Sequence, residues 1–184
     1  KRRMFLQPRV GDSLFITSVT ILSLAAYDDA AVIGDRLGDY AATYYSVDAD
    51  TFTVYAGSFS IVADGAHVVR YYSADVTGNA EAVKTSSITV DNVSPVVLVD
   101  IAGVVYSSAS VSYIPAASTV TLAASDNASG IKELYYELNG SCYTVPVDSK
   151  TLELTEGIYT LVYNAADNLG NRSALDISIR AKIT

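Results

Sequence analysis

Three aspartates, each followed directly by an asparagine, are the residues of this chain whose types suggest metal chemistry: Asp91, Asp126 and Asp167. Carboxylate and amide oxygens are the hard ligands that Ca²⁺ prefers, and it takes about six to eight of them. The three aspartates lie far apart in the sequence, so only the fold decides whether they meet. Aspartate also caps turns with its own carboxylate, so each of the three has a purely structural interpretation as well.

The residues that nucleophilic or acid–base catalysis requires are scarce. The chain has one histidine, His67, and one cysteine, Cys142. Sequence alternation places His67 on the inward face of a strand, as a core or rim histidine, and predicts that Cys142 is a small buried hydrophobe. The acids Asp28–Asp29, Asp48 and Asp50 fall in predicted turns, where solvated turn formers are expected rather than a general acid and base. We therefore predict no enzyme, no catalytic or cofactor-binding residue and no cofactor.

An internal repeat sets the elements that position these residues. Residues 64–79 recur as residues 156–171, at a constant offset of 92 (156 − 64 = 92). Both copies alternate with period two, which is typical of a half-buried strand, and both end in Asp-x-x-Gly-Asn. In that motif Asp caps a turn and Gly supplies a positive φ, so each strand is expected to fold straight back on its successor. The matched positions include Gly65 with Gly157, Tyr71 with Tyr163, and Asp75 with Asp167.

Length and composition agree with this repeat. A chain of 184 residues with a period near 92 predicts two small β domains, residues 1–92 and residues 93–184. Half of the residues are apolar, which is enough for two cores. The net charge of −8 argues against nucleic acid as a partner, and the single cysteine excludes an intrachain disulfide. We expect no membrane-spanning segment within this chain.

The beginning of the chain is irregular. Its basic start and the apolar run 14–26 superficially resemble a signal peptide. However, residues 15–16 align with residues 113–114 and residues 24–28 with residues 122–126, so this run is predicted to form strands. The first repeat has no counterpart of the apolar segment 94–100. Domain 1 is therefore predicted to lack its first strand, and its open edge to be filled by residues 1–10, by upstream chain or by a neighbouring molecule. Since residue 1 is not methionine, we expect a piece of a longer protein.

Two connecting segments complete the sequence pattern. Residues 30–40 form a loop longer than its counterpart in the second repeat, either as a contact point or through neutral drift in loop length. Residues 91–95 form a short linker that ends in proline, which restricts the backbone before it. The two domains are therefore expected to stand end to end with limited swing.

Both halves resemble tandem bacterial immunoglobulin-like repeats, the kind found in large surface proteins of spirochaetes and other bacteria. The resemblance rests on the Leu-Ala-Ala-x-Asp and Asp-x-x-Gly-Asn motifs and on the Val-Asp-Asn-x-Ser-Pro linker, and it covers nearly the whole chain. It implies an all-β fold of two tandem immunoglobulin-like antiparallel β-sandwich domains. It also implies an exported protein, extracellular or at the cell surface, in which such repeats are spacers or adhesive modules.

Immunoglobulin connections bring the incoming linker and two of the interstrand loops to one pole of a sandwich. Asp91, Asp126 and Asp167 are therefore expected at one pole of domain 2, where they are either calcium ligands at the domain joint or caps of their own turns. We prefer the second interpretation and assign no metal ligand, leaving calcium binding as an open hypothesis.

Three functions fit the sequence. Our first hypothesis is a non-enzymatic spacer or adhesive module of a bacterial surface protein, with a protein or glycan of the cell surface as partner. The second is a structural subunit of an extracellular filament, in which copies of the chain join through the open edge of domain 1. The third is a carbohydrate-binding accessory module of a larger secreted enzyme, suggested by fourteen tyrosines that could stack on sugar rings.

Overall fold

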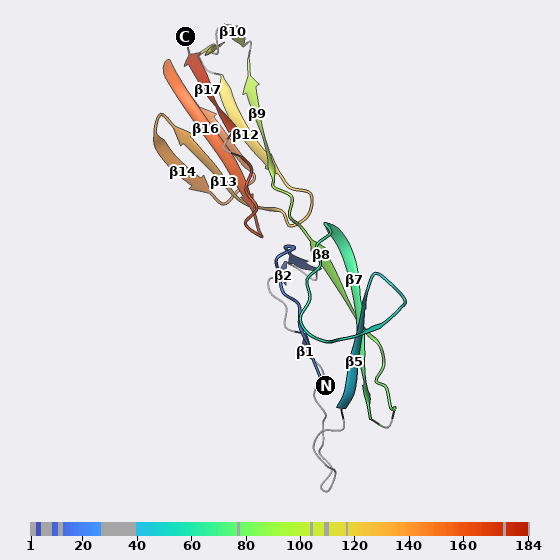
Figure 1. Ribbon diagram of the computed structural model, residues 1–184. Coiled ribbons are helices and arrows are strands. Elements are labelled where there is room, and N and C mark those ends of the chain that lie inside the picture. The colour runs from blue at the N-terminus through green and yellow to red at the C-terminus, as the bar shows by residue number, and fades with distance from the viewer. Residues whose placement is uncertain are drawn as a thin grey trace. The chain divides into compact units, whose positions relative to one another are not determined.

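A computed structural model describes residues 3–4, 9–10, 13–26, 40–76, 78–103, 105–108, 111–116, 118–174 and 176–183 (Figure 1). The chain divides into two compact units, Lys1–Asn92 and Val93–Thr184, called the first and second unit below. Every regular element among the described residues is a β-strand, and none of these residues forms a helix that is long and apolar enough to cross a membrane.

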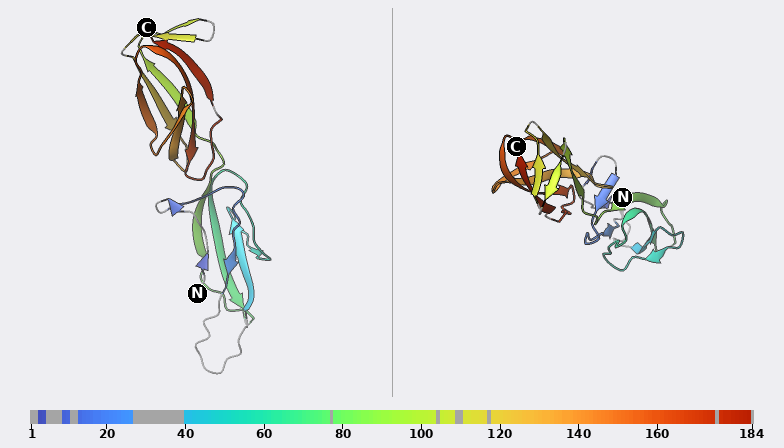
Figure 2. Two further views of the ribbon diagram at one scale, coloured as in Figure 1. Left: turned by 90° about the vertical axis from the view of Figure 1, so that its left-hand side faces the viewer. Right: turned by 90° about the horizontal axis from the view of Figure 1, so that it is seen from above.

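The second unit is a sandwich of two sheets (Figure 2). One sheet has the order β15-β12-β9, and the other has the order β10-β11-β17-β16-β13-β14. Side chains from both sheets meet in one core, which includes Leu122 of the smaller sheet and Leu134 of the larger. The strands are β9 (Val96–Ala102), β10 (Tyr106–Ser108), β11 (Val111–Ile114), β12 (Thr119–Ser125), β13 (Ile131–Leu138), β14 (Ser141–Val145), β15 (Ser149–Glu153), β16 (Gly157–Asp167) and β17 (Asp176–Ile183).

The first unit repeats this arrangement, although its strands β1, β4 and β6 have only two residues each. Its larger sheet has the order β2-β3-β8-β7-β5-β6, and β1 and β4 form a second, two-stranded sheet. Its core includes Ile16, Leu22, Val69 and Ile88. The strands are β1 (Arg3–Met4), β2 (Arg9–Val10), β3 (Ser13–Ile16), β4 (Leu24–Ala25), β5 (Tyr40–Val47), β6 (Thr53–Val54), β7 (Gly65–Asp75) and β8 (Lys84–Val90).

The predicted all-β, immunoglobulin-like sandwich fold is confirmed. The repeated stretch forms β7 in one unit and β16 in the other, and each pairs antiparallel with its successor, β8 or β17. One feature of the larger sheets differs from an all-antiparallel description, because β3 lies parallel to β8 and β11 lies parallel to β17. Each of these strands lies between its parallel neighbour and an antiparallel edge strand, which is β2 beside β3 and β10 beside β11.

Of the three candidates for the open edge of the first unit, the structure places residues from the stretch 1–10 there. Strand β1 pairs with β4 through Arg3–Ala25 and Met4–Leu24, the place that β9 takes beside β12 in the second unit. The pairing involves only two residues, and one of them is a charged arginine. The short strand therefore carries none of the apolar alternation by which β9 is recognised in the sequence.

The strand interpretation of the apolar run near the beginning is confirmed, since it contains β3 and β4, and Ile16 and Leu22 are buried. The predicted loop enlargement at residues 30–40 lies outside the described residues, apart from Tyr40 at the start of β5.

The turns that end β7 and β16 have the predicted chemistry. Gly78 and Gly170 both have a φ of +92°, in the left-handed region that disfavours side chains. A Cβ at either glycine would meet no atom within 4 Å, so substitution there acts through backbone strain alone. We expect Gly170→Ala to destabilise the second unit by about 1 kcal/mol, measured by urea unfolding. An unchanged midpoint would show that the turn can change type without cost.

Candidate metal centre

The turn after β16 is organised by the carboxylate of Asp167, which is fully buried. Its Oδ1 accepts hydrogen bonds from the backbone N–H groups of Leu169 (2.8 Å) and Asn171 (2.9 Å). Its Oδ2 accepts one from the side-chain amide of Asn171 at 2.7 Å. These bonds confirm that Asp167 caps its own turn.

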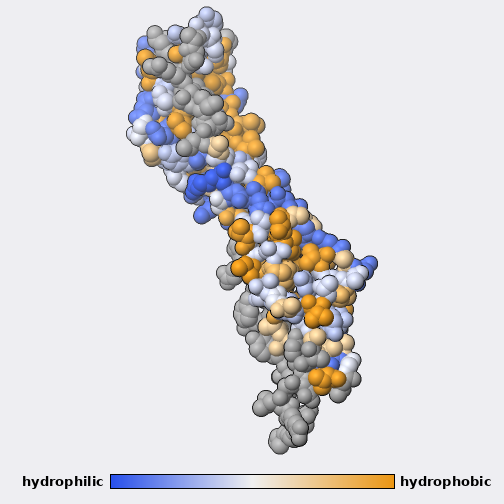
Figure 3. Space-filling view, in the orientation of Figure 1, coloured by the Kyte–Doolittle hydropathy of each residue, from blue (hydrophilic) through white to orange (hydrophobic). Residues whose placement is uncertain are grey.

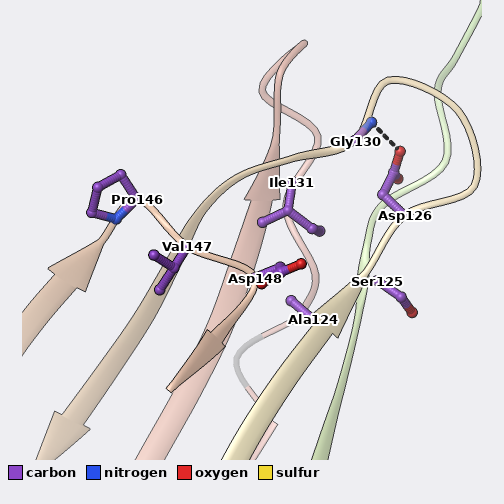
Figure 4. A pocket seen from close by; sticks show the side chains of 8 residues that line it. All are labelled: Ala124, Ser125, Asp126, Gly130, Ile131, Pro146, Val147 and Asp148. Carbon is purple, nitrogen blue, oxygen red and sulfur yellow. Dashed lines mark hydrogen bonds between the residues drawn. The ribbon is translucent and has the colours of Figure 1, made fainter.

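The loop between β12 and β13 is organised in the same way by Asp126. Its Oδ2 accepts hydrogen bonds from the backbone N–H groups of Ala128 (3.0 Å) and Gly130 (2.8 Å). Figure 4 shows the second of these bonds, with the carboxylate turned toward Gly130. Asn168 joins this loop to the turn after β16, because its side-chain amide donates to the carbonyl oxygens of Ser129 (2.7 Å) and Gly130 (3.1 Å).

The two loops bring two carboxylates together. Ligand oxygens of Asp126 and Asp167 lie within 4.8 Å of each other. Turn capping accounts for Oδ2 of Asp126 and for both oxygens of Asp167, but Oδ1 of Asp126 is buried and has no hydrogen-bond partner. Capping alone therefore leaves one carboxylate oxygen unexplained.

The electrostatics of this pair favour a cation. Two carboxylates this close repel each other, and a buried carboxylate is costly unless it is paired or coordinates a metal. None of the ion pairs among the described residues involves Asp126 or Asp167. A hard divalent cation such as Ca²⁺ would satisfy the free oxygen of Asp126 and offset the repulsion.

Asp91, the third aspartate of the sequence hypothesis, belongs to the first unit and is described there. Its side chain is buried, and its backbone N–H donates to the carbonyl of Ile16 at 2.8 Å. The next residue, Asn92, accepts a hydrogen bond from the N–H of Ser18 at 2.8 Å and donates its amide to Asp64 at 2.7 Å. The last residues of the first unit are thereby tied to the loop that follows β3.

An open pocket of about 630 Å³ lies beside the loop of Asp126 (Figure 4). It combines the carboxylates of Asp126 and Asp148 with the apolar side chains of Ile131, Pro146 and Val147. The remaining lining residues are Ala124, Ser125 and Gly130. Among the described residues that line the pocket, none is a histidine, a cysteine or a basic residue.

Both ring nitrogens of the single histidine lie within hydrogen-bond distance of oxygen atoms of the first unit. Nδ1 of His67 lies 2.5 Å from Oδ2 of Asp48, and Nε2 lies 2.8 Å from the carbonyl oxygen of Ala63. Only 11% of the side chain is exposed, in agreement with a rim position. Because both ring nitrogens are engaged by acceptors, His67 has no free nitrogen with which to act as a general base. Asp50 is paired with Arg70, and Asp28–Asp29 lie outside the described residues.

The prediction that Cys142 is buried was wrong. Cys142 is exposed on β14, the edge strand of the larger sheet in the second unit. Its Sγ accepts a hydrogen bond from the hydroxyl of Tyr135 at 3.2 Å, and this bond is the main reason that the pKa of Tyr135 is raised to about 12. The outer face of an edge strand does not require burial, so a small apolar residue there can stay exposed.

The chain was compared with known proteins, and a similar solved structure was found. No family model and no curated protein matches the chain. The chain is similar to the fibronectin(III)-like modules of Clostridium thermocellum CbhA, at 14% identity and a TM-score of 0.44, over 100% of this chain and 94% of that chain. The assignment of the fold rests on the strand order of each unit, given above.

Proposed function

We propose that the chain is a non-enzymatic spacer or adhesive module of an exported bacterial protein. The observation that carries this proposal is the duplication: both units build a core from the same positions and close it with the same capped turn. Ile16 and Ile114 are both buried, as are Tyr71 and Tyr163. A structural role, in which the same domain shape is needed twice, explains such a duplication, and no catalytic site is required.

A turnover screen tests the non-enzymatic part of this proposal. We expect the chain to convert no ester, peptide, glycoside or phosphoester faster than a buffer blank. Turnover by the wild type that is lost in the His67→Gln variant, the change that removes the single imidazole, would contradict the proposal.

The filament alternative depended on an open edge in the first unit. Pairing of β1 with β4 fills that position with the chain's own residues, at Arg3–Ala25 and Met4–Leu24. This pairing supports the spacer over strand exchange between neighbours. If the chain is a spacer, we expect it to stay monomeric at millimolar concentration, as measured by sedimentation.

The carbohydrate alternative depended on tyrosine faces available for stacking. Several rings instead pack against each other: Tyr44 on Tyr72 with centroids 5.0 Å apart, and Tyr136 on Tyr143 at 4.8 Å. Exposed apolar side chains occur on both units, as the orange surface in Figure 3 shows, and they include Val62 and Ile158. These two side chains are aliphatic and offer no flat ring to a sugar. Tyr106, Tyr113 and Tyr143 of the second unit are exposed as well, so the case against the carbohydrate alternative rests on the packed tyrosine pairs.

A second candidate function is binding of a divalent cation by the second unit, and the buried, unpartnered Oδ1 of Asp126 beside Asp167 is the observation that favours it. If Ca²⁺ binds there, the wild type is expected to gain about 2.7 kcal/mol of stability at a free concentration about 100 times the dissociation constant. Thermal unfolding in Ca²⁺ and in EDTA measures this gain.

The repeat supplies a matched control for the calcium experiment. Asp75 caps the turn after β7 as Asp167 caps the turn after β16, and it accepts hydrogen bonds from Asn79 at 2.8 Å. Asp126→Asn and Asp167→Asn are expected to abolish the calcium-dependent gain, whereas Asp75→Asn keeps it. The same melting temperature in Ca²⁺ and EDTA for the wild type would remove the candidate. Asp91→Asn, measured in parallel, tests the third aspartate of the sequence hypothesis.

A further inference from the structure

We propose that His67, Asp48 and Ala63 form a pH-sensitive clasp that stabilises the first unit in mildly acidic medium and weakens as the medium becomes alkaline. The clasp joins three segments of the first unit: strand β7, the turn between β5 and β6, and the loop that precedes β7.

Two acceptors face the imidazole. Nδ1 of His67 meets a carboxylate oxygen of Asp48, and Nε2 meets the carbonyl oxygen of Ala63. A neutral imidazole has only one N–H, so it can donate to one of these oxygens and must turn a lone pair toward the other. The imidazolium donates to both. The geometry therefore selects the protonated ring.

Asp48 transmits this interaction to the backbone. It has a φ of +53°, a left-handed conformation that aspartate tolerates better than most residues. Its Oδ1 accepts a hydrogen bond from the N–H of Val68 at 2.7 Å, and its own N–H donates to the carbonyl of Val68 at 3.0 Å. The carboxylate thus holds the turn against β7 while its other oxygen holds the histidine.

The other charged groups around the clasp have partners of their own. Asp64, on the loop before β7, accepts hydrogen bonds from Asn92, and Asp50, on the same turn as Asp48, pairs with Arg70 of β7. Ile88, opposite His67 on β8, is apolar. Among the described residues, Asp48 is therefore the charged group that determines the state of the ring.

The second unit closes the same corner with neutral residues. Asn139 stands where the first unit has Asp48, with a φ of +49°, and its Oδ1 accepts a hydrogen bond from the N–H of Thr160 at 2.8 Å. Tyr159 stands where the first unit has His67, and its hydroxyl lies 3.2 Å from that of Thr155. The fold therefore does not require a charged pair at this corner, and the charge adds a pH dependence that the neutral corner of the second unit lacks.

The direction of the pH dependence follows from both partners. The bond to Asp48 is the main reason that the pKa of His67 is raised above 6.5. The contribution of His67 to the stability of the first unit is therefore complete below about pH 6.5, and it is lost as pH rises through the raised pKa. The pKa of Asp48 is lowered below 3.8, mainly by the hydrogen bond from the backbone of Val68 and next by the bond from His67. The contribution of Asp48 to stability is therefore lost only as pH falls through this lowered pKa. The clasp is therefore strongest between about pH 4 and pH 6.5.

The full chain tests this proposal directly because it contains a single histidine. In an NMR titration we expect the His67 midpoint above 6.5 in the wild type and closer to 6.5 in Asp48→Asn. A wild-type midpoint at or below 6.5 would overturn the clasp.

Thermal unfolding provides the second measurement. Between pH 6 and pH 8.5 the melting temperature of the first unit is expected to fall by roughly 2–5 °C. The double variant Asp48→Asn/His67→Tyr, which copies the neutral pair of the second unit, is expected to lose most of this fall. An equal fall in the double variant would overturn the proposal, and the titration decides the matter if that variant does not fold.

Discussion

Replacing Ile114 by alanine is expected to lower the free energy of unfolding of the second unit by about 2–5 kcal/mol and to leave the first unit unchanged. Ile114 lies at the end of β11, is 1% exposed and belongs to the core of the second unit. Removing its side chain forfeits the burial of three carbons and leaves a cavity that the surrounding sandwich can close only in part. Calorimetry of the full chain, with two transitions assigned to the two units, measures the effect.

Ile16 is the matched control, because it occupies the same position in β3 and is fully buried in the core of the first unit. Ile16→Ala is expected to lower the other transition by a similar amount. If either variant shifted both transitions equally, the two cores would be one cooperative structure.

Replacing Asp167 by alanine is expected to destabilise the second unit by about 2–4 kcal/mol, even in EDTA. The carboxylate is fully buried and accepts three hydrogen bonds, two from backbone N–H groups and one from the side chain of Asn171. Alanine leaves those donors without their acceptor inside the turn. Urea unfolding in EDTA isolates this structural cost from any effect of a cation.

Asp75→Ala removes the corresponding cap from the first unit and is expected to cost less. Asp75 accepts hydrogen bonds from the backbone and side chain of Asn79 at 2.8 Å, and it is only half-buried, so water can replace part of what is lost. A larger loss for Asp75→Ala than for Asp167→Ala would contradict the role assigned to burial.

The features that could be predicted well from the sequence depend on short local patterns, and each pattern occurs in both repeats. The alternation of residues 64–79 and 156–171 specifies strand and inward face, and Gly78 and Gly170 need a positive φ that few other residues adopt. Because two independent copies share these signals, chance agreement is improbable. The fold class follows from them.

The features that it missed depend on contacts between distant segments. The parallel pairing of β3 with β8 is determined by where the chain crosses between sheets, which no local pattern records. Strand β1 is too short and too polar to alternate, and the exposure of Cys142 depends on β14 being an edge strand. Each of these properties belongs to a pair of segments rather than to either alone.

The candidate metal centre falls between these two cases. The Asp-Asn pairs at 126–127 and 167–168 are visible in the sequence, and so is the turn chemistry that each aspartate performs. Only the packing of two loops through Asn168 brings the carboxylates together and leaves Oδ1 of Asp126 unpaired. Turn capping and cation binding are therefore compatible, whereas the sequence presented them as alternatives.

Stretching the single chain between its two ends tests most directly whether the protein is a tandem of two self-contained sandwiches. Each unit spans 92 residues, Lys1–Asn92 and Val93–Thr184, so two separate unfolding events are expected, each lengthening the chain by about 300 Å. One event of about twice that length would show a single merged core and contradict the account.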